Sequence, residues 1–158
     1  MTLAEKLLPK LSEWRPASAG RHSWSEAFPD AGWIVHITTD KVDSLSCLVW
    51  ELTLTRTADA PAGLTLKGWA DAVADRVSGL MESLRLYEVD DTRAEAVLRS
   101  EVPARKGEGL SYYEVRLHGL TRAAVRRYTA AKAAPGRDQV PFAITHEALA
   151  KLAGDIAG

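Results

Sequence analysis

Apolar residues recur along the chain with two different spacings. Leu3, Leu7 and Leu11 lie four residues apart, which places them on one side of a helix. Thr2 and Glu5 stand three residues apart at the start of this stripe and form the sequence signature of an N-terminal capping box. Further along, apolar and polar residues alternate instead, as they do in half-buried strands. We therefore predict a short amphipathic helix followed by three antiparallel strands, over residues 2–14, 21–28, 32–39 and 44–57.

The third of these strands has the cleanest alternation, and it predicts which side chains face the core. Its even positions are apolar from Leu48 to Leu54 and include Trp50, whereas most of its odd positions are polar. Four of the five tryptophans fall on predicted apolar faces in this way. We expect these four to lie in the core: Trp14, Trp33, Trp50 and Trp69.

A second helical stripe begins at Leu66 and continues to Leu84, with charged residues on its other side. It predicts a long central helix. The residues that follow form two alternating runs separated by the turn-forming pair Asp90-Asp91, which predicts a hairpin.

The last third of the chain predicts more strands and a final helix. Residues 103–109 are rich in Gly, Pro and charge and predict a loop, whereas residues 110–118 alternate and predict a strand. The segment after Gly119 contains many helix-forming residues, but its apolar positions trace no helical face, so we predict a second strand that pairs with the first. Residues 139–144 predict one more strand, and Thr145 is placed to cap a C-terminal helix.

The predicted order is a helix, three strands, a helix, four to five strands and a helix. Because the strands follow one another instead of alternating singly with helices, we predict an α+β fold with an antiparallel sheet of about seven to eight strands. A chain of 158 residues has the size of one domain, and we predict a single domain over residues 1–158. In element order the chain resembles the small dimeric secretion chaperones. This resemblance is one of topology, and no site residue is carried over from it.

Composition indicates where the protein works. Its single cysteine, Cys47, has no partner for an internal disulfide, which favours a reducing, cytoplasmic setting. The N-terminus lacks the apolar run of a signal peptide, and no stretch provides the roughly 20 apolar residues that cross a membrane. The absence of Asn and the excess of Ala and Arg are typical of a GC-rich coding sequence. We therefore expect a cytoplasmic bacterial protein without membrane association.

The charges are unevenly placed although the formal net charge is only -1. Residues 93–137 contain ten basic and four acidic residues, so the rest of the chain is acidic. Such a distribution suits an anionic partner or head-to-tail self-association.

The sequence predicts no catalytic, metal or cofactor site. His146-Glu147 begins like a zinc-protease motif, but Ala150 stands where the second histidine must lie on the same helix face. Cys47 falls on an apolar strand, where a thiol usually behaves as a small buried hydrophobe, and only His36 on the preceding strand offers a base. We therefore favour a non-catalytic protein without metal or cofactor.

Two parts of the sequence offer a surface for a partner. One is Trp24, which has polar neighbours on its own side of its strand, so its ring can serve as an exposed interface anchor. The other is the predicted hairpin after residue 110, where arginines and tyrosines share a face with Glu114. That glutamate can pair with an arginine across the strands and reduce the positive charge. The candidate interaction residues are Trp24, Tyr112, Arg116, His118, Arg126, Arg127 and Tyr128.

Three hypotheses about function follow from these residues. The leading one is a protein-interaction domain, adaptor-like or chaperone-like, that binds another protein or forms a homodimer. The second is a small-molecule pocket, enzymatic or not, between the sheet and the central helix, lined by Trp and His. The third is binding of single-stranded nucleic acid through the arginines and tyrosines, which the isoelectric point near 6.4 disfavours.

Overall fold

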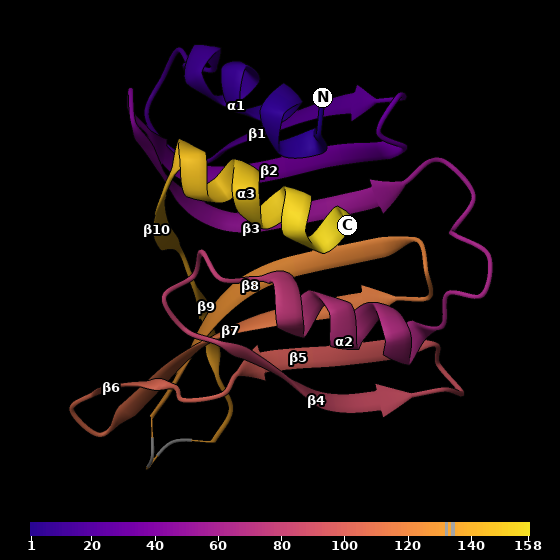
Figure 1. Ribbon diagram of the computed structural model, residues 1–158. Coiled ribbons are helices and arrows are strands. Elements are labelled where there is room, and N and C mark those ends of the chain that lie inside the picture. Colours follow the sequence, from indigo (N-terminus) through magenta and orange to yellow (C-terminus); the bar gives the residue numbers. More distant parts are fainter. Residues whose placement is uncertain (132, 134) are drawn as a thin grey trace.

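The helices of the described residues all lie on the same side of one antiparallel sheet (Figure 1). This computed structural model describes residues 1–131, 133 and 135–158. Within them the three helices are α1 (Leu3–Glu13), α2 (Leu66–Arg76) and α3 (His146–Ala157). The ten strands of the same residues are β1 (His22–Phe28), β2 (Trp33–Val42), β3 (Ser46–Arg56), β4 (Leu84–Asp90), β5 (Glu95–Ser100), β6 (Ala104–Lys106), β7 (Gly109–His118), β8 (Arg122–Ala131), β9 (Asp138–Val140) and β10 (Phe142–Thr145).

The sheet consists of two antiparallel meanders that meet along β3 and β8. Its strand order is β1-β2-β3-β8-β7-β5-β4, so the last long strand of each meander lies in the middle. Residues 52–55 of β3 pair with residues 122–125 of β8, and beyond this stretch each strand takes another partner. There β9 pairs with β8 and β10 pairs with β3, on either side of Pro141. The side chain of Gln139 donates to the carbonyl oxygen of Trp50 at 2.8 Å and so links β9 to β3.

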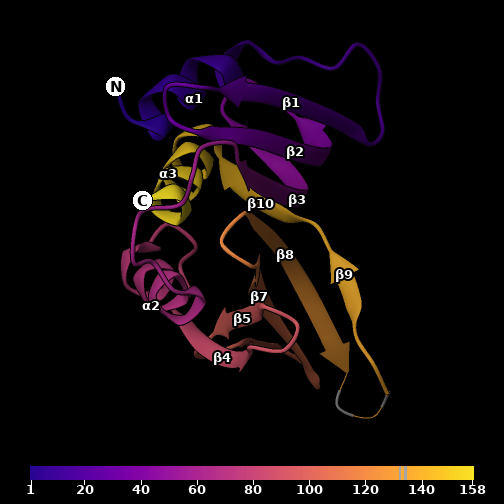
Figure 2. The ribbon, with the colours of Figure 1, turned by 90° about the vertical axis from the view of Figure 1, so that its right-hand side faces the viewer.

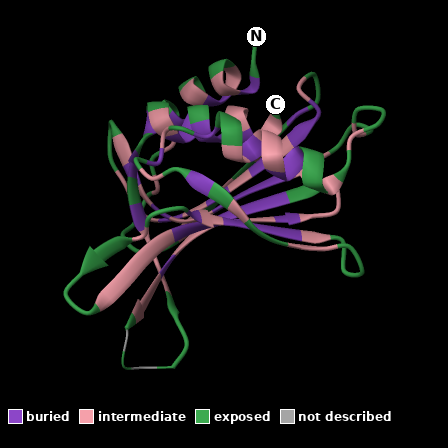
Figure 3. Cartoon of the chain, turned by 60° about the horizontal axis from the view of Figure 1, so that its bottom comes forward, coloured by how far each residue is buried: buried purple, intermediate pink, exposed green. Residues whose placement is uncertain are grey.

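The apolar core fills the space between the sheet and the helices. Figure 2 shows the sheet curving around the helices, and Figure 3 shows the buried residues gathered in the middle of the strands and along the helix sides that face them. Leu52, Leu54 and Leu117 are completely buried in this layer. The indole nitrogen of Trp69 on α2 donates to the carbonyl oxygen of Ile156 on α3 at 3.0 Å, which ties two helices together across the core.

The predicted fold class and element order are confirmed, but the central helix is shorter than predicted. α2 ends at Arg76, with Val77 as its extended C-cap, because Ser78 and Gly79 are poor helix formers. The apolar stripe continues beyond the helix because the turn also contributes to the core, where Leu80 is buried. Met81 in the same turn is almost fully exposed and has a positive φ of 62°.

A β-bulge in β3 overturns the predicted core position of Trp50. Along the β2–β3 ladder Trp50 has no partner, so one extra residue is inserted at this point of β3. Val49 and Leu52 both belong to the core, and the two residues between them, Trp50 and Glu51, lie outside it. The Trp50 ring instead stacks beneath the guanidinium of Arg21, at 3.9 Å. A strict two-residue period therefore assigned Trp50 to the wrong face.

Two shorter segments also differ from the prediction. Residues 104–106 of the predicted loop form β6, which pairs with the start of β7. The single strand predicted near residues 139–144 is divided into β9 and β10 by Pro141, which lacks the N–H group that a ladder needs. As for membranes, none of the helices in the described part of the chain has the length and hydropathy to cross a bilayer.

Candidate functional site

The sheet surface that faces away from the helices, here called the open face, is covered by none of the described helices (Figures 1 and 2). β7 shows how sharply the two faces differ. Tyr113, Val115 and Leu117 belong to the core, whereas Glu114 and Arg116 between them point the other way and form ion pairs. The open face of the second meander is therefore a polar surface, while its covered face is apolar.

Most of the candidate interaction residues lie on this open face. Tyr112, Arg116 and His118 come from β7 and stand opposite Tyr128, Ala124 and Arg122 of β8, in a ladder that also pairs Glu114 with Arg126. The hairpin expected from the sequence thus brings five of the candidates together on one surface. These five are Tyr112, Arg116, His118, Arg126 and Tyr128.

The other two candidates lie on the covered side of the sheet. The guanidinium of Arg127 stacks on the Tyr113 ring at 4.3 Å, and its Nη2 lies 3.1 Å from Oε2 of Glu82. Trp24 is half-buried against α1, with its ring 6.3 Å from that of Trp14. Neither side chain contributes to the open face.

Glu114 is the centre of a charge cluster on the open face, and its side chain is only 3% exposed. Arg137 holds both carboxylate oxygens, with Nη1 at 2.8 Å and Nη2 at 3.2 Å. Arg99 donates from Nε at 3.1 Å, and Nη2 of Arg116 lies at 3.7 Å. Burial alone raises the pKa of Glu114, but the hydrogen bonds and positive charges of these arginines outweigh it and lower the pKa below its usual range. The carboxylate is therefore charged, and both of its oxygens accept hydrogen bonds from arginines.

Stacked tyrosines and arginines form a row across four strands of the open face. The Arg99 guanidinium lies 4.1 Å from the Tyr87 ring and 5.3 Å from the Tyr112 ring. The Tyr112 and Tyr128 rings are 6.1 Å apart, and Arg137 covers Tyr128 at 3.6 Å. Contacts of this kind contribute about 0.5–1 kcal/mol each at exposed sites. They hold the long side chains in defined positions.

A second group of ion pairs lies beside the Glu114 cluster. Arg126 pairs with Glu51 of β3 through its Nε, and its Nη1 also donates to the Tyr128 hydroxyl at 3.4 Å. On the other side, Glu95 of β5 lies 3.2 Å from Nδ1 of His118 and 3.5 Å from Nη1 of Arg116. The three ion pairs of this group each join neighbouring strands, so they link the strands across the open face.

Between these groups the open face is hollowed over β7 and β8. The hollow has a volume of about 330 Å³. Arg122 stands at its rim, exposed, and no ion pair of its side chain occurs within the described residues. The lining residues are Glu114, Arg116, His118, Arg122, Ala124 and Arg126.

The surroundings of Cys47 disfavour a nucleophilic thiolate. Burial in the core, together with the nearby charge of Asp43, raises the pKa of the Cys47 thiol to about 11, which suppresses the nucleophilic thiolate. His36, the base considered from the sequence, lies near Thr38 Oγ1 at 3.4 Å, on a side of β2 that faces away from the core. Across residues 1–131, 133 and 135–158, no group of three or more His, Cys, Asp or Glu side chains is arranged to hold a metal ion.

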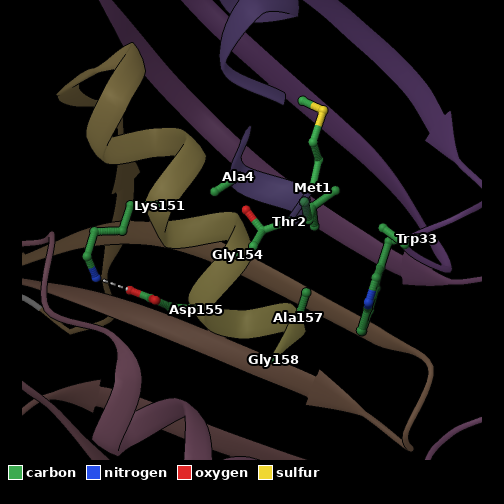
Figure 4. A pocket seen from close by; sticks show the side chains of 11 residues that line it. Met1, Thr2, Ala4, Trp33, Lys151, Gly154, Asp155, Ala157 and Gly158 are labelled. Carbon is green, nitrogen blue, oxygen red and sulfur yellow. Dashed lines mark hydrogen bonds and ion pairs between the residues drawn. The ribbon is translucent and has the colours of Figure 1, made fainter. Parts of the chain in front are cut away.

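Two other hollows lie among the helices. The one in Figure 4, of about 390 Å³, separates the start of α1 from the end of α3 and contains the ion pair of Lys151 with Asp155 at 2.6 Å. A groove of about 490 Å³ runs between α1 and α3 and is lined by Leu8 and Ala148 among others. None of the buried polar atoms that lack a partner in the described structure belongs to the lining of either hollow. Nothing in them therefore points to a particular ligand.

The space between the sheet and α2, where the sequence suggested a small-molecule pocket, is filled by side chains. Trp69 and Val73 of α2 and Leu98 of β5 are at most 2% exposed there.

Several members of the open-face cluster were not among the candidates from the sequence. Arg99, Arg137 and Glu51 come from other strands or from the segment before β9, and only the strand order brings them to Glu114 and Arg126. The excess of basic residues between positions 93 and 137 was the one signal in the sequence for this cluster. No protein-family model matches the chain, and no curated protein or solved structure is significantly similar to it.

Proposed function

We propose that the protein is a non-catalytic interaction module that binds a partner protein through the open face of its sheet. The observation that supports this most directly is the composition of the face, where tyrosines and arginines stand side by side over β5, β7 and β8. These residue types, with tryptophan, dominate the energetic centres of protein interfaces. Trp50, which the bulge places outside the core, extends this surface onto β3.

The ion pairs and stacked rings support the same proposal because they order the face before a partner arrives. Arg99, Arg116 and Arg137 are each held by Glu114, and Arg126 is held by Glu51. An immobilised long side chain costs about 0.5–1.5 kcal/mol of conformational entropy on binding. A partner that meets side chains already in place avoids much of this cost.

Two other partners fit the face less well. Nucleic acid would need unpaired cations and open ring faces, but most arginines here are paired with glutamates and Arg137 covers Tyr128. A second copy of the chain, the homodimer expected from the sequence, would bring two clusters of surplus positive charge together. The element order shared with small secretion chaperones carries no function by itself.

Site-specific photo-crosslinking in cells tests this proposal. A benzoylphenylalanine in place of Thr55 on the open face should crosslink a partner protein, whereas the same probe in place of the exposed Asp75 on α2 should not. The partner is then identified, purified and titrated against the chain by isothermal calorimetry. Arg126→Glu should weaken that binding by about tenfold or more, because like charges across an interface cost several kcal/mol.

Two outcomes would contradict the proposal. One is a partner that crosslinks from Asp75 and not from Thr55, which would move the binding surface to the helix layer. The other is crosslinking from Thr55 to a second copy of the chain alone, together with dimers in sedimentation that Arg126→Glu abolishes.

A further inference from the structure

We infer that the partner contributes an acidic segment and that the hollow between β7 and β8 receives one of its carboxylates. This inference rests on the proposed function and names the chemistry of the partner. The hollow is lined by three arginines and His118 over a single glutamate, Glu114. Because Glu114 is already held by three guanidinium groups, it offers little attraction to a cation.

The charges of the whole cluster do not balance. Three glutamates face five arginines, so two positive charges remain with His118 taken as neutral. The chain as a whole is slightly acidic, with a formal charge of -1, so this surplus is local to the open face. A local positive surplus around a concave site attracts anionic groups and orients them on approach. The arginines are Arg99, Arg116, Arg122, Arg126 and Arg137, and the glutamates are Glu51, Glu95 and Glu114.

Arg122 is the residue of this cluster that is available to a new anion. It begins β8, directly opposite His118 of β7 and Thr55 of β3. Its side chain is exposed and forms no ion pair with any residue that the structure describes, unlike the other four arginines. A planar guanidinium matches a carboxylate with two parallel hydrogen bonds, and Arg126 lines the same hollow.

The number of unpaired cations favours a protein segment over nucleic acid. A strand of nucleic acid presents a phosphate at every residue and is held by several cations along its length. Among the described residues one arginine of the cluster, Arg122, forms no ion pair, and a single carboxylate is sufficient to pair with it. An acidic peptide can place one Asp or Glu in the hollow, beside Arg122 and Arg126.

A titration followed by NMR tests this inference with a hexaglutamate peptide whose two ends are blocked. In the wild-type chain the largest shifts should occur at the Arg122 and Arg126 side chains and at the backbone amides of residues 122–126. Arg122→Glu should weaken binding about tenfold or more, a loss of roughly 1.4 kcal/mol or above. Arg105→Glu is the matched control, since Arg105 is exposed on β6 and lies outside the lining of the hollow, and it should change the dissociation constant less than twofold.

Three results would overturn the inference. The first is equal weakening by Arg122→Glu and Arg105→Glu, which would indicate charge attraction without a site. The second is tighter binding of a twelve-residue oligothymidylate than of hexaglutamate, with the same Arg122 dependence, which would assign the face to nucleic acid. In the third, the crosslinked partner binds the open face but tolerates Arg122→Glu, so the inference fails while the proposed function stands. The proposed function is tested separately by the crosslinking experiment, because crosslinking from Asp75 instead of Thr55 would contradict it whatever Arg122→Glu does.

Discussion

The two faces of β7 are built from alternate residues of one strand, yet they are stabilised by different forces. On the covered face, Val115 and Leu117 are completely buried, and they stabilise the fold through the non-directional burial of apolar surface. On the open face, Glu114 and Arg116 are held by ion pairs that need defined geometry and particular partners. The covered face is therefore stabilised by burial, whereas the open face is stabilised by specific ion pairs.

Two buried titratable groups sharpen this contrast. Glu114 on the open face is surrounded by guanidinium groups that match its charge. His146, at the start of α3 on the covered side, is only 3% exposed, and neither of its ring nitrogens has a hydrogen-bond partner within the described residues. Burial disfavours the charged form of both groups. For Glu114 the surrounding arginines outweigh this effect, whereas for His146 it prevails and the pKa is lowered.

The largest effect is expected from the covered face. Leu117→Ala removes a completely buried side chain from the middle of the core and should lower the free energy of unfolding by about 2–5 kcal/mol. Its neighbour His118 lies half-exposed on the open face, and His118→Ala should cost less than about 1 kcal/mol. Urea denaturation of both variants at pH 7 measures the difference. Equal losses of unfolding free energy would contradict the conclusion that the covered face contributes most of the stability.

The next effect concerns the carboxylate at the centre of the open face. Glu114→Gln leaves three guanidinium groups without their shared charge and should cost about 1–3 kcal/mol, less than for a fully buried pair because the arginines are about a third exposed. Glu95→Gln is the matched control, since Glu95 is more exposed, and it should cost less than about 1 kcal/mol.

The same variant should change stability in acid. The pKa of Glu114 is lowered in the folded protein, so the unfolded chain binds more protons as the pH falls below about 4.5. The stabilisation by Glu114 is present above that pH and is lost as the pH falls through the lowered pKa. The free energy of unfolding, measured by urea denaturation between pH 5 and 3, should therefore fall less steeply with falling pH for Glu114→Gln than for the wild type. The same pH dependence in both proteins would show that Glu114 does not supply this acid-sensitive stabilisation.

A smaller effect, in a different pH window, is expected from His146. Burial and the positive charge of Arg15 lower the pKa of His146, although Asp43 opposes them. The unfolded chain therefore binds a proton first, and stability should fall as the pH drops below about 6.5, by at most about 1.4 kcal/mol per pH unit. His146→Leu should flatten the profile between pH 7 and 5, while Glu114→Gln should keep the wild-type slope there. A His146→Leu profile as steep as the wild type would show that another group titrates.

Local features of the strands could be predicted from the sequence, whereas irregularities in them could not. Alternation within β7 and β8 was sufficient to predict the shared face of Tyr112, Arg116 and His118, because the period of a strand is a local property. The same rule failed at Trp50, where a bulge adds one residue and reverses the phase. The helical stripe from Leu66 placed Leu80 in a helix, although a turn buries that residue equally well.

The partners on the open face depend on strand order, which the sequence did not determine. Arg126 and Glu51 are 75 residues apart and meet only because β3 and β8 are neighbours. Arg137 reaches Glu114 because β9 pairs with β8 and brings the preceding residue across the face. Two of the candidates, Trp24 and Arg127, lie on the covered side because each contacts a ring there: Trp14 for the first and Tyr113 for the second. Sequence could predict the residue types of the surface but not its connections.

The smallest effect on stability is expected at Arg122, where the effect on binding should be large. Its side chain is exposed and forms no ion pair with the described residues, so Arg122→Glu should change the free energy of unfolding by less than about 0.5 kcal/mol. Glu114→Gln, one strand away, should lose several times more. Urea denaturation of the two variants in the buffer used for the peptide titration makes the comparison direct. An exposed residue that acts only in binding a partner contributes little to the stability of the free protein. A loss of unfolding free energy above about 1 kcal/mol for Arg122→Glu would therefore indicate that Arg122 has a structural role in the sheet.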